Sequence, residues 1–427
     1  MENNIAVAID IGTTKIYVIV AEIDEVTGKF QVKGYGTSTS KGMKKGLVVD
    51  VERTASDIKQ AVKEAEAMSG IEIKSACIGV SGKHIESVLT SAEIYLGEKP
   101  RIILEEDYNK LIQVAKNKGI NYDRRVLHEI AFNYRIDKGG IVKNPIGMQG
   151  EKLEADVHLI TGSEKEIVSL KNALSSIDIE IEEIVLEPYA SAMAVLTSSE
   201  KKFGTVIVDI GGGTTDIGIY RNEKLIYSSV IPIGGEHFTN DISYVLNIDL
   251  DRADMIKKEF SYKEKNISKL EEEEIVIRER NSFANRYIPL SELKEITDCR
   301  IDDILEQIDE KIQESGFSDY ISNGIVFTGG SSQIAGLKER SESYFDKHDI
   351  KMGIPIEIEG LLENMNKPEN STGIGLLIYS VEKYTKEKRK KYTVKKTIDK
   401  VESKNGDEEA EELPFTSKIK DFFSNLF

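Results

Sequence analysis

A short pattern of residues occurs twice in this 427-residue chain, and it constrains the possible folds more than any other feature. The first copy spans residues 5–21 and the second spans residues 205–220. In each copy an apolar run ends in an aspartate, Asp10 or Asp209, and a turn of glycine and threonine leads into a second apolar run. Each copy predicts a β-hairpin. Two such hairpins about 200 residues apart predict two related α/β domains that face each other across a cleft.

The stretches between the strands have the apolar periodicity of amphipathic helices, which makes the fold class α/β. Between residue 82 and about residue 162 the pattern changes to short strands around one helix, with Asn144-Pro145 marking a turn, so a small inserted α+β subdomain is expected there. The predicted helices are residues 54–68, 105–118, 165–175 and 301–314. The predicted division is domain 1 at 1–82, the inserted subdomain at 83–163, the return of domain 1 at 164–199, domain 2 at 200–382 with its own insertion around 240–310, a linker at 383–414 and a terminal helix at 415–427.

Charge is distributed unevenly along the chain. The whole chain has 57 Lys and Arg against 74 Asp and Glu, a net charge of −17, which argues against a nucleic-acid partner because phosphate neutralisation needs a basic face. Residues 383–400, however, have nine basic and two acidic side chains, and residues 402–412 have six acidic and one basic. Few large apolar residues occur in either block, so we expect a disordered, charge-segregated linker. The basic block either assists binding to anionic lipid or is an inert solubilising run.

The last 13 residues have the pattern of an amphipathic helix. At about 100° per residue the apolar side chains occupy an arc of about 140°. A helix that docks back onto the globular body is one explanation, but the long linker adds closure entropy to such a contact, and four exposed phenylalanines favour a lipid interface. One such helix binds weakly, so polymerisation would raise the avidity by adding helices in parallel. The residues predicted to contact the membrane are Phe415, Ile419, Phe422, Phe423, Leu426 and Phe427.

The sequence contains no signal for export or membrane spanning. No stretch reaches the roughly 18 to 20 apolar residues that cross a bilayer, and Met1-Glu2-Asn3-Asn4 lacks the basic region of a signal peptide. Cys77 and Cys299 have the spacing of neither a disulfide framework nor a zinc site, so both are expected to be reduced core residues. We therefore expect a cytoplasmic protein whose membrane contact is peripheral.

The turns of the two hairpins suit an anion. Glycine lets backbone N–H groups approach a phosphate closely, the threonines add hydroxyl donors, and Lys15 adds a positive charge. No Walker A pattern occurs, and strands follow the turns, so two hairpins would hold the phosphates from opposite sides. Asp10 and Asp209 end their strands where Mg²⁺ bridging the phosphates would need carboxylate oxygens. Either aspartate alone is better explained as a turn cap, but the same arrangement twice favours the metal.

A third glycine element lies at residues 324–337, where an apolar strand, the pair Gly329-Gly330 and a helix start follow one another. Backbone without side chains would let a flat ring or a ribose lie against it. Turns of this kind are common and usually structural, so the element is informative because it follows the two hairpins. In this order the three elements are similar to the phosphate and adenosine motifs of the actin, Hsp70 and sugar-kinase ATPase superfamily.

Further motifs narrow the resemblance to one family. They are Val80-Ser81-Gly82-Lys83-His84-Ile85, His128-Glu129, Ile136-Asp137, Asn144-Pro145-Ile146-Gly147-Met148-Gln149-Gly150, Leu153-Glu154-Ala155-Asp156-Val157-His158, Leu186-Glu187-Pro188-Tyr189-Ala190-Ser191-Ala192 and Gly234-Gly235-Glu236-His237-Phe238-Thr239-Asn240-Asp241-Ile242. With these motifs the chain resembles, over roughly residues 5–380, the FtsA family of bacterial actin-like cell-division proteins. The inserted segment after Gly82 distinguishes this family from other bacterial actins and from chaperones, and the resemblance implies an actin-like two-domain ATPase fold with an inserted subdomain.

The resemblance implies roles for individual residues. Asp10 and Asp209 would serve Mg²⁺ and its waters. Glu187 would orient the attacking water, although a helix-capping acid ahead of Pro188 explains this residue equally well. The implied nucleotide-binding residues are Gly12, Thr13, Thr14, Lys15, Gly211, Gly212, Gly213, Thr214, Gly234, Gly235, Asp254, Lys257, Gly329, Gly330 and Ser331.

The chain departs from the family pattern at three places. Asp254 replaces the glutamate of the A-E-x-x-K motif that contacts ribose and adenine, and its side chain is one methylene shorter. Asp298-Cys299-Arg300 replaces the family's Glu-Pro-Arg, and residues 96–100 form a short, atypical stretch of the inserted subdomain. None of these changes falls in the phosphate motifs.

The resemblance implies an ATP-binding scaffold with bound Mg²⁺ that polymerises on the inner face of the cell membrane at the division septum. Its implied partners are the C-terminal peptide of the tubulin-like GTPase FtsZ, further copies of itself, membrane lipid and other division proteins. The same cradle could hold ATP or hydrolyse it weakly. The alternatives are a small-molecule kinase of the superfamily, which needs a substrate pocket with a catalytic base, and a PilM-like pilus-assembly adaptor, which normally lacks the linker and amphipathic helix.

Overall fold

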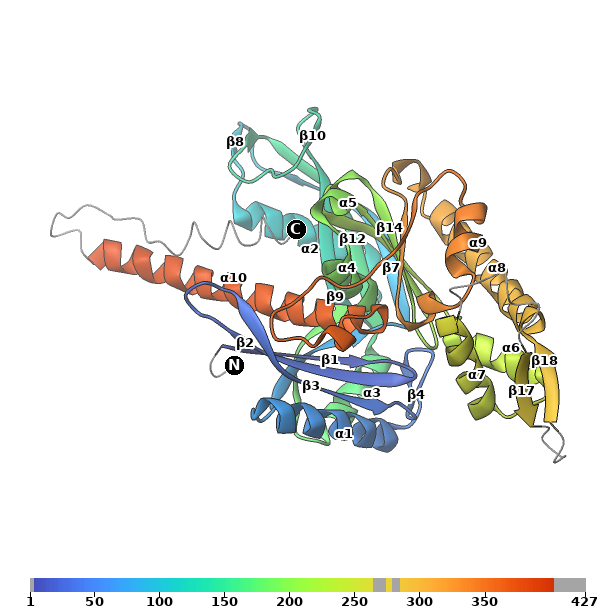
Figure 1. The fold of residues 1–427 in the computed structure, drawn as a ribbon. Helices are drawn as coiled ribbons and strands as arrows, with labels where there is room; N and C mark the ends of the chain where they lie inside the picture. The colour runs from blue at the N-terminus through green and yellow to red at the C-terminus, as the bar shows by residue number, and fades with distance from the viewer. Residues whose placement is uncertain (1–3, 264–273, 279–284, 403–427) are drawn as a thin grey trace.

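The computed structural model describes residues 4–263, 274–278 and 285–402, and the statements below concern those residues. Its central feature is a pair of five-stranded sheets with the same topology (Figure 1). The first sheet has the order β13-β6-β1-β2-β3, with β1 at Ile5–Ile11, β2 at Lys15–Ile23, β3 at Phe30–Thr39, β6 at Ser75–Val80 and β13 at Glu180–Leu186. The second has the order β16-β15-β14-β19-β20, with β14 at Thr205–Ile210, β15 at Thr215–Arg221, β16 at Lys224–Ile231, β19 at Ile325–Thr328 and β20 at Ile350–Met352.

The same pattern of strand directions occurs in both sheets. Three neighbouring strands are antiparallel, and two further strands join in parallel beside the first strand of the hairpin. The first hairpin is β1–β2 and the second is β14–β15. The predictions of an α/β fold and of two related domains, each with one hairpin, are therefore confirmed.

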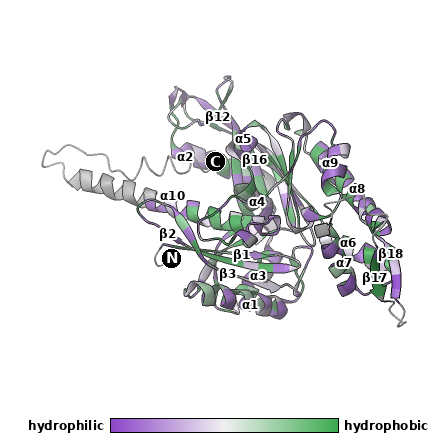
Figure 2. Ribbon diagram, in the orientation of Figure 1, coloured by the Kyte–Doolittle hydropathy of each residue, from purple (hydrophilic) through white to green (hydrophobic). Residues whose placement is uncertain are grey.

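Helices cover both faces of each sheet. The helices concerned are α1 (Val51–Ser69), α3 (Glu164–Ser175), α4 (Glu187–Val195), α8 (Leu290–Glu314), α9 (Leu337–Tyr344) and α10 (Ser371–Glu402). Apolar residues of α1 and α3 pack on the outer face of the first sheet, and those of α8 and α9 pack on the outer face of the second. The residues of α4 and α10 form one core with the inner faces of both sheets. Figure 2 shows the hydrophobic residues concentrated in α4 and in the strands, because those elements are covered on both sides.

The predicted helices all occur. Residues 54–68 lie in α1, residues 105–118 in α2 (Glu105–Gly119), residues 165–175 in α3, and residues 301–314 in the second half of α8. The ends of α1 are set locally, since the side chain of Asp50 caps its first turn and Gly70, with φ of 70°, ends it. A short helix, α5 (Ser198–Phe203), leads from α4 into the second sheet.

The inserted subdomain is an α+β unit with its own hydrophobic core, formed where α2 packs on a four-stranded sheet. The sheet has the order β10-β9-β12-β7, with β7 at Ile85–Tyr95, β9 at Arg124–Ile136, β10 at Ile141–Val142 and β12 at Lys152–Ser163, and the short pair β8 (Arg101–Ile102) and β11 (Gln149–Gly150) lies beside it. His158 of β12 is fully buried and connects this unit to the second sheet. Its Nδ1 atom donates to the carbonyl of Leu225 at 3.0 Å, and its Nε2 atom accepts from the hydroxyl of Ser87 at 2.7 Å.

The second domain also carries an insertion, which lies between β16 and β19. It consists of α6 (Gly235–Leu246), α7 (Leu250–Lys263), β17 (Glu274–Arg278), β18 (Asn285–Pro289) and the first part of α8. These elements have a small core of their own, to which Ile242, Phe260 and Leu293 contribute. On the side of the first domain, β4 (Met43–Lys44) and β5 (Leu47–Val48) form a short separate hairpin.

Helix α10 extends beyond the predicted domain boundary. Residues 383–402 are helical where a linker was expected over residues 383–414. Lys, Arg and Glu are strong helix formers, and Lys386 pairs with Glu382 one turn earlier at 3.0 Å, so a high charge content did not exclude a helix. The first part of the predicted linker therefore continues a helix that begins in the core.

The predicted terminal helix falls outside the described residues. Its predicted membrane contacts Phe415, Ile419, Phe422, Phe423, Leu426 and Phe427 lie there as well. Among the helices that the structure describes, none is long and apolar enough to cross a membrane. Cys77 is buried as expected, but Cys299 is exposed because it lies on the solvent side of α8.

Candidate functional site

A large cleft lies between the two domains, and the turns of both hairpins line it. Its volume is about 1150 Å³, which is enough for a nucleotide. The first turn, residues 12–15, and the second turn, residues 211–214, close in the same way. The amide of Gly12 donates to the carbonyl of Lys15 at 3.0 Å, and the amide of Gly211 donates to the carbonyl of Thr214 at 2.9 Å.

The tips of the two turns touch. A Cβ atom added at Gly212 would lie 2.7 Å from Oγ1 of Thr14, and one added at Gly213 would lie 2.6 Å from Oγ1 of Thr13. Both distances are shorter than side-chain contacts allow, so the second turn must consist of glycine at these positions for the domains to approach this closely. The threonines of one domain and the backbone of the other thus face the same space.

The hairpin register brings a third aspartate to the cleft. Asp10 lies opposite Tyr17 in β1–β2, whereas Asp209 lies opposite Asp216 in β14–β15. Asp216 is buried and lines the cleft together with Asp10 and Asp209. The motif analysis missed Asp216, although counting the register outward from the turn would have paired it with Asp209.

Hydroxyl groups hold these carboxylates in place. Asp209 accepts hydrogen bonds from Ser191 of α4 and from Thr372 at the start of α10, the latter at 3.1 Å. Asp216 accepts from Thr214 at 2.9 Å and from Ser81, which belongs to the first domain. The bond from Ser81 to Asp216 therefore joins the two domains across the cleft.

Burial and mutual repulsion shift the acidity of this cluster. The pKa of Asp10 is raised to about 7, because burial raises it, Lys15 partly opposes the shift and the nearby carboxylate of Asp209 adds to it. Burial also raises the pKa of Asp216 to about 7, with Asp209 adding to the effect, and it raises the pKa of Asp209 itself. So much buried negative charge is costly unless a cation shares the site.

The donor set fits Mg²⁺. This ion prefers carboxylate oxygens, usually takes only one or two from the protein and keeps several waters. Asp10 and Asp209 can serve it in that way, and its charge would offset the repulsion within the cluster. Within the described part of the chain, no group of three His, Cys, Asp or Glu side chains is placed to hold an ion by itself.

Lys15 at the end of the first turn is tied to the segment that precedes α10. Its Nζ atom donates to the carbonyl of Glu369 at 2.9 Å and to Oδ1 of Asn370 at 2.7 Å. Burial lowers the pKa of Lys15, while Glu369 and Asp10 oppose the shift. Glu369, Asn370 and Thr372 line the cleft, and the sequence analysis identified none of the three.

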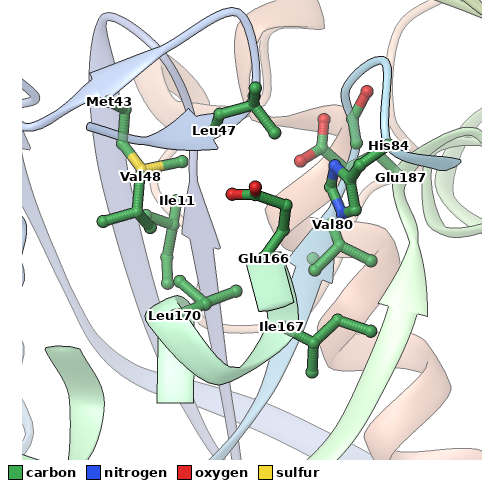
Figure 3. A pocket seen from close by; sticks show the side chains of 13 residues that line it. Ile11, Met43, Leu47, Val48, Val80, His84, Glu166, Ile167, Leu170 and Glu187 are labelled. Atoms are coloured by element: carbon green, nitrogen blue, oxygen red, sulfur yellow. The ribbon is translucent and has the colours of Figure 1, made fainter. Parts of the chain in front are cut away.

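Glu187 is the first residue of α4, and it lines both the large cleft and a small cavity behind it (Figure 3). Burial raises the pKa of its carboxyl well above the usual range, and Asp10 adds to the shift. The small cavity measures about 20 Å³, which is room for a water molecule, and His84 also lines it. The cap position of α4 belongs to Leu186, so the geometry favours a role for Glu187 in the cleft over a helix cap.

Asp254 and Lys257, which are expected to contact the adenosine, line the cleft on the side of α7. Lys257 forms an ion pair with Asp254 at 2.8 Å and donates to the carbonyl of Gly235 and to Thr239. Asp254 also pairs with Lys258, so the shorter acid still reaches both Lys257 and Lys258 of α7.

Glycine is required at the third glycine element. Gly329 has a φ of 89°, and a Cβ atom there would lie 2.2 Å from Oδ1 of Asp209. Ser331 donates to the carbonyl of Gly211 at 2.9 Å and so supports the second turn. Gly234 is the one expected nucleotide residue that does not line the cleft, because it caps α6 behind the second turn.

Comparison with known proteins agrees with this architecture. The family described as "Cell division protein FtsA" matches residues 206–375, and the "SHS2 domain inserted in FTSA" matches residues 82–161. The MreB5 protein of Spiroplasma citri, solved with bound ADP, is 15% identical over 91% of this chain and 99% of its own, with a TM-score of 0.54. A type IV pilus PilM–PilN complex gives 13% identity over 88% of this chain and 98% of the other, with a TM-score of 0.60. Both structures support the actin-like fold alone.

Curated relatives extend over nearly the whole chain. The FtsA protein of Pseudomonas aeruginosa is 35% identical over 88% of this chain and 89% of its own length. That of Borreliella burgdorferi is 33% identical over 99% of both chains. That of Escherichia coli K12 is 30% identical over 90% of this chain and 92% of its own. With its two-domain fold, its inserted subdomain and these relatives, the chain belongs to the FtsA family of cell-division proteins.

Proposed function

We propose that this chain binds ATP with Mg²⁺ in the cleft between its two domains. The observation that carries the proposal is the meeting of the two turns beside the buried carboxylates Asp10 and Asp209. Backbone amides and threonine hydroxyls of both turns would hold the phosphates, with Lys15 as a cation. The adenosine would lie at the end formed by Lys257 and Gly330. Mg²⁺ would be held by Asp10 and Asp209 through its waters and would neutralise phosphate charge.

Hydrolysis, where it occurs, would depend on Glu187. This carboxyl borders the cleft and the small cavity, so it can hydrogen-bond a water between them. Burial and the nearby Asp10 raise its pKa well above the usual range, which favours the protonated form, whereas a cation in the cluster would favour the carboxylate that acts as a base. We therefore propose that turnover is slow and that the protein mainly holds its nucleotide.

We further propose that the protein is a scaffold that polymerises at the cytoplasmic face of the cell membrane and anchors the FtsZ ring at the septum. Family membership and the actin-like fold support self-assembly and a role in division. The amphipathic pattern of residues 415–427 supports the membrane contact. Helix α10 extends out from the core and ends at Glu402, before that segment in the sequence (Figure 1). The C-terminal peptide of FtsZ and other division proteins would bind to the folded domains.

Two measurements test the proposal. Calorimetry of the full chain with ATP and Mg²⁺ should show binding, and no binding would refute the nucleotide assignment. Sedimentation with vesicles that contain anionic phosphatidylglycerol should pull down the full chain. ATP and FtsZ peptide added to the sample should be recovered in the pellet with it. A chain without residues 415–427 should stay in the supernatant, and unchanged sedimentation would refute the membrane contact.

The alternative functions give different results in the same experiments. A small-molecule kinase of the superfamily would turn ATP over rapidly when a sugar or acid metabolite is added, independently of vesicles. A pilus-assembly adaptor would bind neither vesicles through residues 415–427 nor the FtsZ peptide.

A further inference from the structure

The short hairpin β4–β5 has an unusual turn. Met43 pairs with Val48 and Lys44 pairs with Leu47, so Lys45 and Gly46 form a two-residue loop. Both have positive φ, 50° at Lys45 and 74° at Gly46, as in a type I′ turn. Asparagine or glycine fits the first of these positions better than lysine, which pays a steric cost in the left-handed region. Lys45 and Gly46 therefore form a tight turn whose tip has a fixed direction.

The hairpin is fixed against the first domain by its apolar side. Met43 is buried, and it gathers with Val48 around Ile11 and Leu170 (Figure 3). At the loop, a Cβ atom on Gly46 would lie 2.7 Å from the carbonyl of Ser81, so the loop is also in close contact with the backbone behind it. The polar tip therefore has a defined position.

That position is the place where the two turns meet. The amide of Gly46 donates to Oγ1 of Thr13 in the first turn at 3.2 Å. A Cβ atom on Gly213 of the second turn would lie 3.0 Å from the Cα atom of Lys45. The tip thus contacts both turns, and Lys44 lines the cleft beside them.

The neighbouring helix terminus is already occupied. The first amides of α6, at Gly235 and Glu236, donate to the carbonyls of Gly211 and Gly212 at 2.9 and 2.8 Å. They hold the second turn, so they are not available to a phosphate. Burial raises the pKa of Glu236, whereas Lys257, Lys44 and Lys45 lower it. Burial lowers the pKa of His237, and Lys45 lowers it further. Both Lys44 and Lys45 therefore lie near the positive end of α6. Positive charge accumulates here with Glu236 as the nearby acid.

Three other lysines of the cleft already have partners. Lys15 is bonded to Glu369 and Asn370, and Lys257 and Lys258 pair with Asp254. Among the described residues that line the cleft, Lys44 and Lys367 are the lysines whose side chains form no hydrogen bond or ion pair. Lys367 acts on the pKa of Lys15 and so belongs to the wall before α10. Lys44 is the uncommitted cation at the point where the turns meet.

We propose that Lys44 is a phosphate-binding residue that contacts the terminal phosphate of the nucleotide and distinguishes ATP from ADP. This inference rests on the proposed ATP binding in the cleft. The β4–β5 hairpin would act as a third phosphate element, with Gly46 bracing Thr13 and Lys45 setting the tip between the two turns. Lys44 would supply the charge that the occupied helix terminus does not.

The test compares ATP and ADP affinities of the full chain by calorimetry in the presence of Mg²⁺. A bond between charged groups is worth a factor of roughly 10 to 100 in affinity, so Lys44→Gln should weaken ATP by about that factor. The same change should weaken ADP by less than about threefold, because the terminal phosphate is missing. Lys44→Arg should restore most of the preference for ATP. Lys41→Gln is the matched control, since it removes the same charge from an exposed residue three positions earlier in the chain that does not line the cleft.

The outcomes separate this inference from the proposal beneath it. If the wild-type chain binds neither nucleotide, the proposed function fails and the role of Lys44 falls with it. If the wild type binds both and Lys44→Gln leaves the ratio of ATP to ADP affinity unchanged, the role of Lys44 is refuted and the ATP site stands. Equal weakening by Lys41→Gln would also refute it, because the effect would then be general electrostatics.

Discussion

The two hairpins share one backbone design, and two of the side-chain differences between them set the charge of the cleft. Counted from the turn, Lys15 of the first hairpin corresponds to Thr214 of the second, and Tyr17 corresponds to Asp216. The first hairpin thus provides a cation and an aromatic ring, with Nζ of Lys15 lying 5.6 Å from the ring centre of Tyr17. The second provides a hydroxyl and a further carboxylate.

This difference teaches how a duplicated element can make one asymmetric site. A carboxylate at position 17 would add to the repulsion that already raises the pKa of Asp10 and Asp216. With an aromatic residue there, the first hairpin contributes one carboxylate, Asp10, and the second contributes two, Asp209 and Asp216. Ser81, Thr214 and other hydroxyls bond the carboxylates of the second hairpin. The backbone repeats, while the charges are divided between the halves.

The largest effect is expected where the two turns touch. Gly212→Val places a branched side chain against Thr14 and forces the tips apart, so ATP affinity should fall by at least about 100-fold. Calorimetry with ATP and Mg²⁺ measures the loss. Gly140→Val is the control, because a Cβ atom there would meet no atom within 4 Å and the residue does not line the cleft. Wild-type affinity in Gly212→Val would show that the turns do not need to approach each other.

The stability of the folded protein should also depend on pH through His158, which joins the inserted subdomain to the second sheet. Burial lowers its pKa to about 4, and that of the nearby His128 likewise. A histidine whose folded pKa lies below its unfolded value stays neutral in the folded protein. Its contribution is therefore complete above about pH 6.5 and is lost as the pH falls toward 4, by about 3 kcal/mol per imidazole.

Denaturant unfolding of the wild type and His158→Gln at several pH values tests this prediction. Glutamine can still donate to the carbonyl of Leu225 but does not titrate, so the variant should lose less stability between pH 6.5 and 4. Parallel curves would show that the junction between β12 and β16 does not sense pH.

Sequence reasoning located the hairpins, the inserted subdomain and most of the cleft because these depend on local signals. Apolar runs and turn glycines are readable residue by residue. Asp216 was missed because its role depends on strand register, and Asn370 because α10 brings it to Lys15 through tertiary packing. The start of the linker was misplaced because charge content does not separate an exposed helix from a disordered chain.

A smaller effect is expected for Asp216→Asn, which makes the second hairpin more like the first by removing a charge. Asparagine keeps the shape and can bond Ser81 and Thr214, so the nucleotide-free protein should gain about 1 kcal/mol in stability through lower repulsion. Affinity for ATP with Mg²⁺ should fall by roughly tenfold, because the cation loses part of the field that attracts it. Denaturant unfolding and calorimetry measure the two changes, and a loss in stability would contradict the repulsion argument.

The smallest effect is expected at the corresponding position of the first hairpin. The hydroxyl of Tyr17 is fully buried, and within the described residues it has no hydrogen-bond partner, while burial raises its pKa. Removing an unsatisfied hydroxyl relieves a desolvation cost, so Tyr17→Phe should stabilise the protein by at most about 1 kcal/mol and leave ATP affinity unchanged. Denaturant unfolding and calorimetry of this variant beside Asp216→Asn make the comparison direct. A destabilised Tyr17→Phe with weaker ATP binding would mean that the hydroxyl reaches Asp10 through a water. Both hairpins would then contribute a second polar group to the cleft at this position.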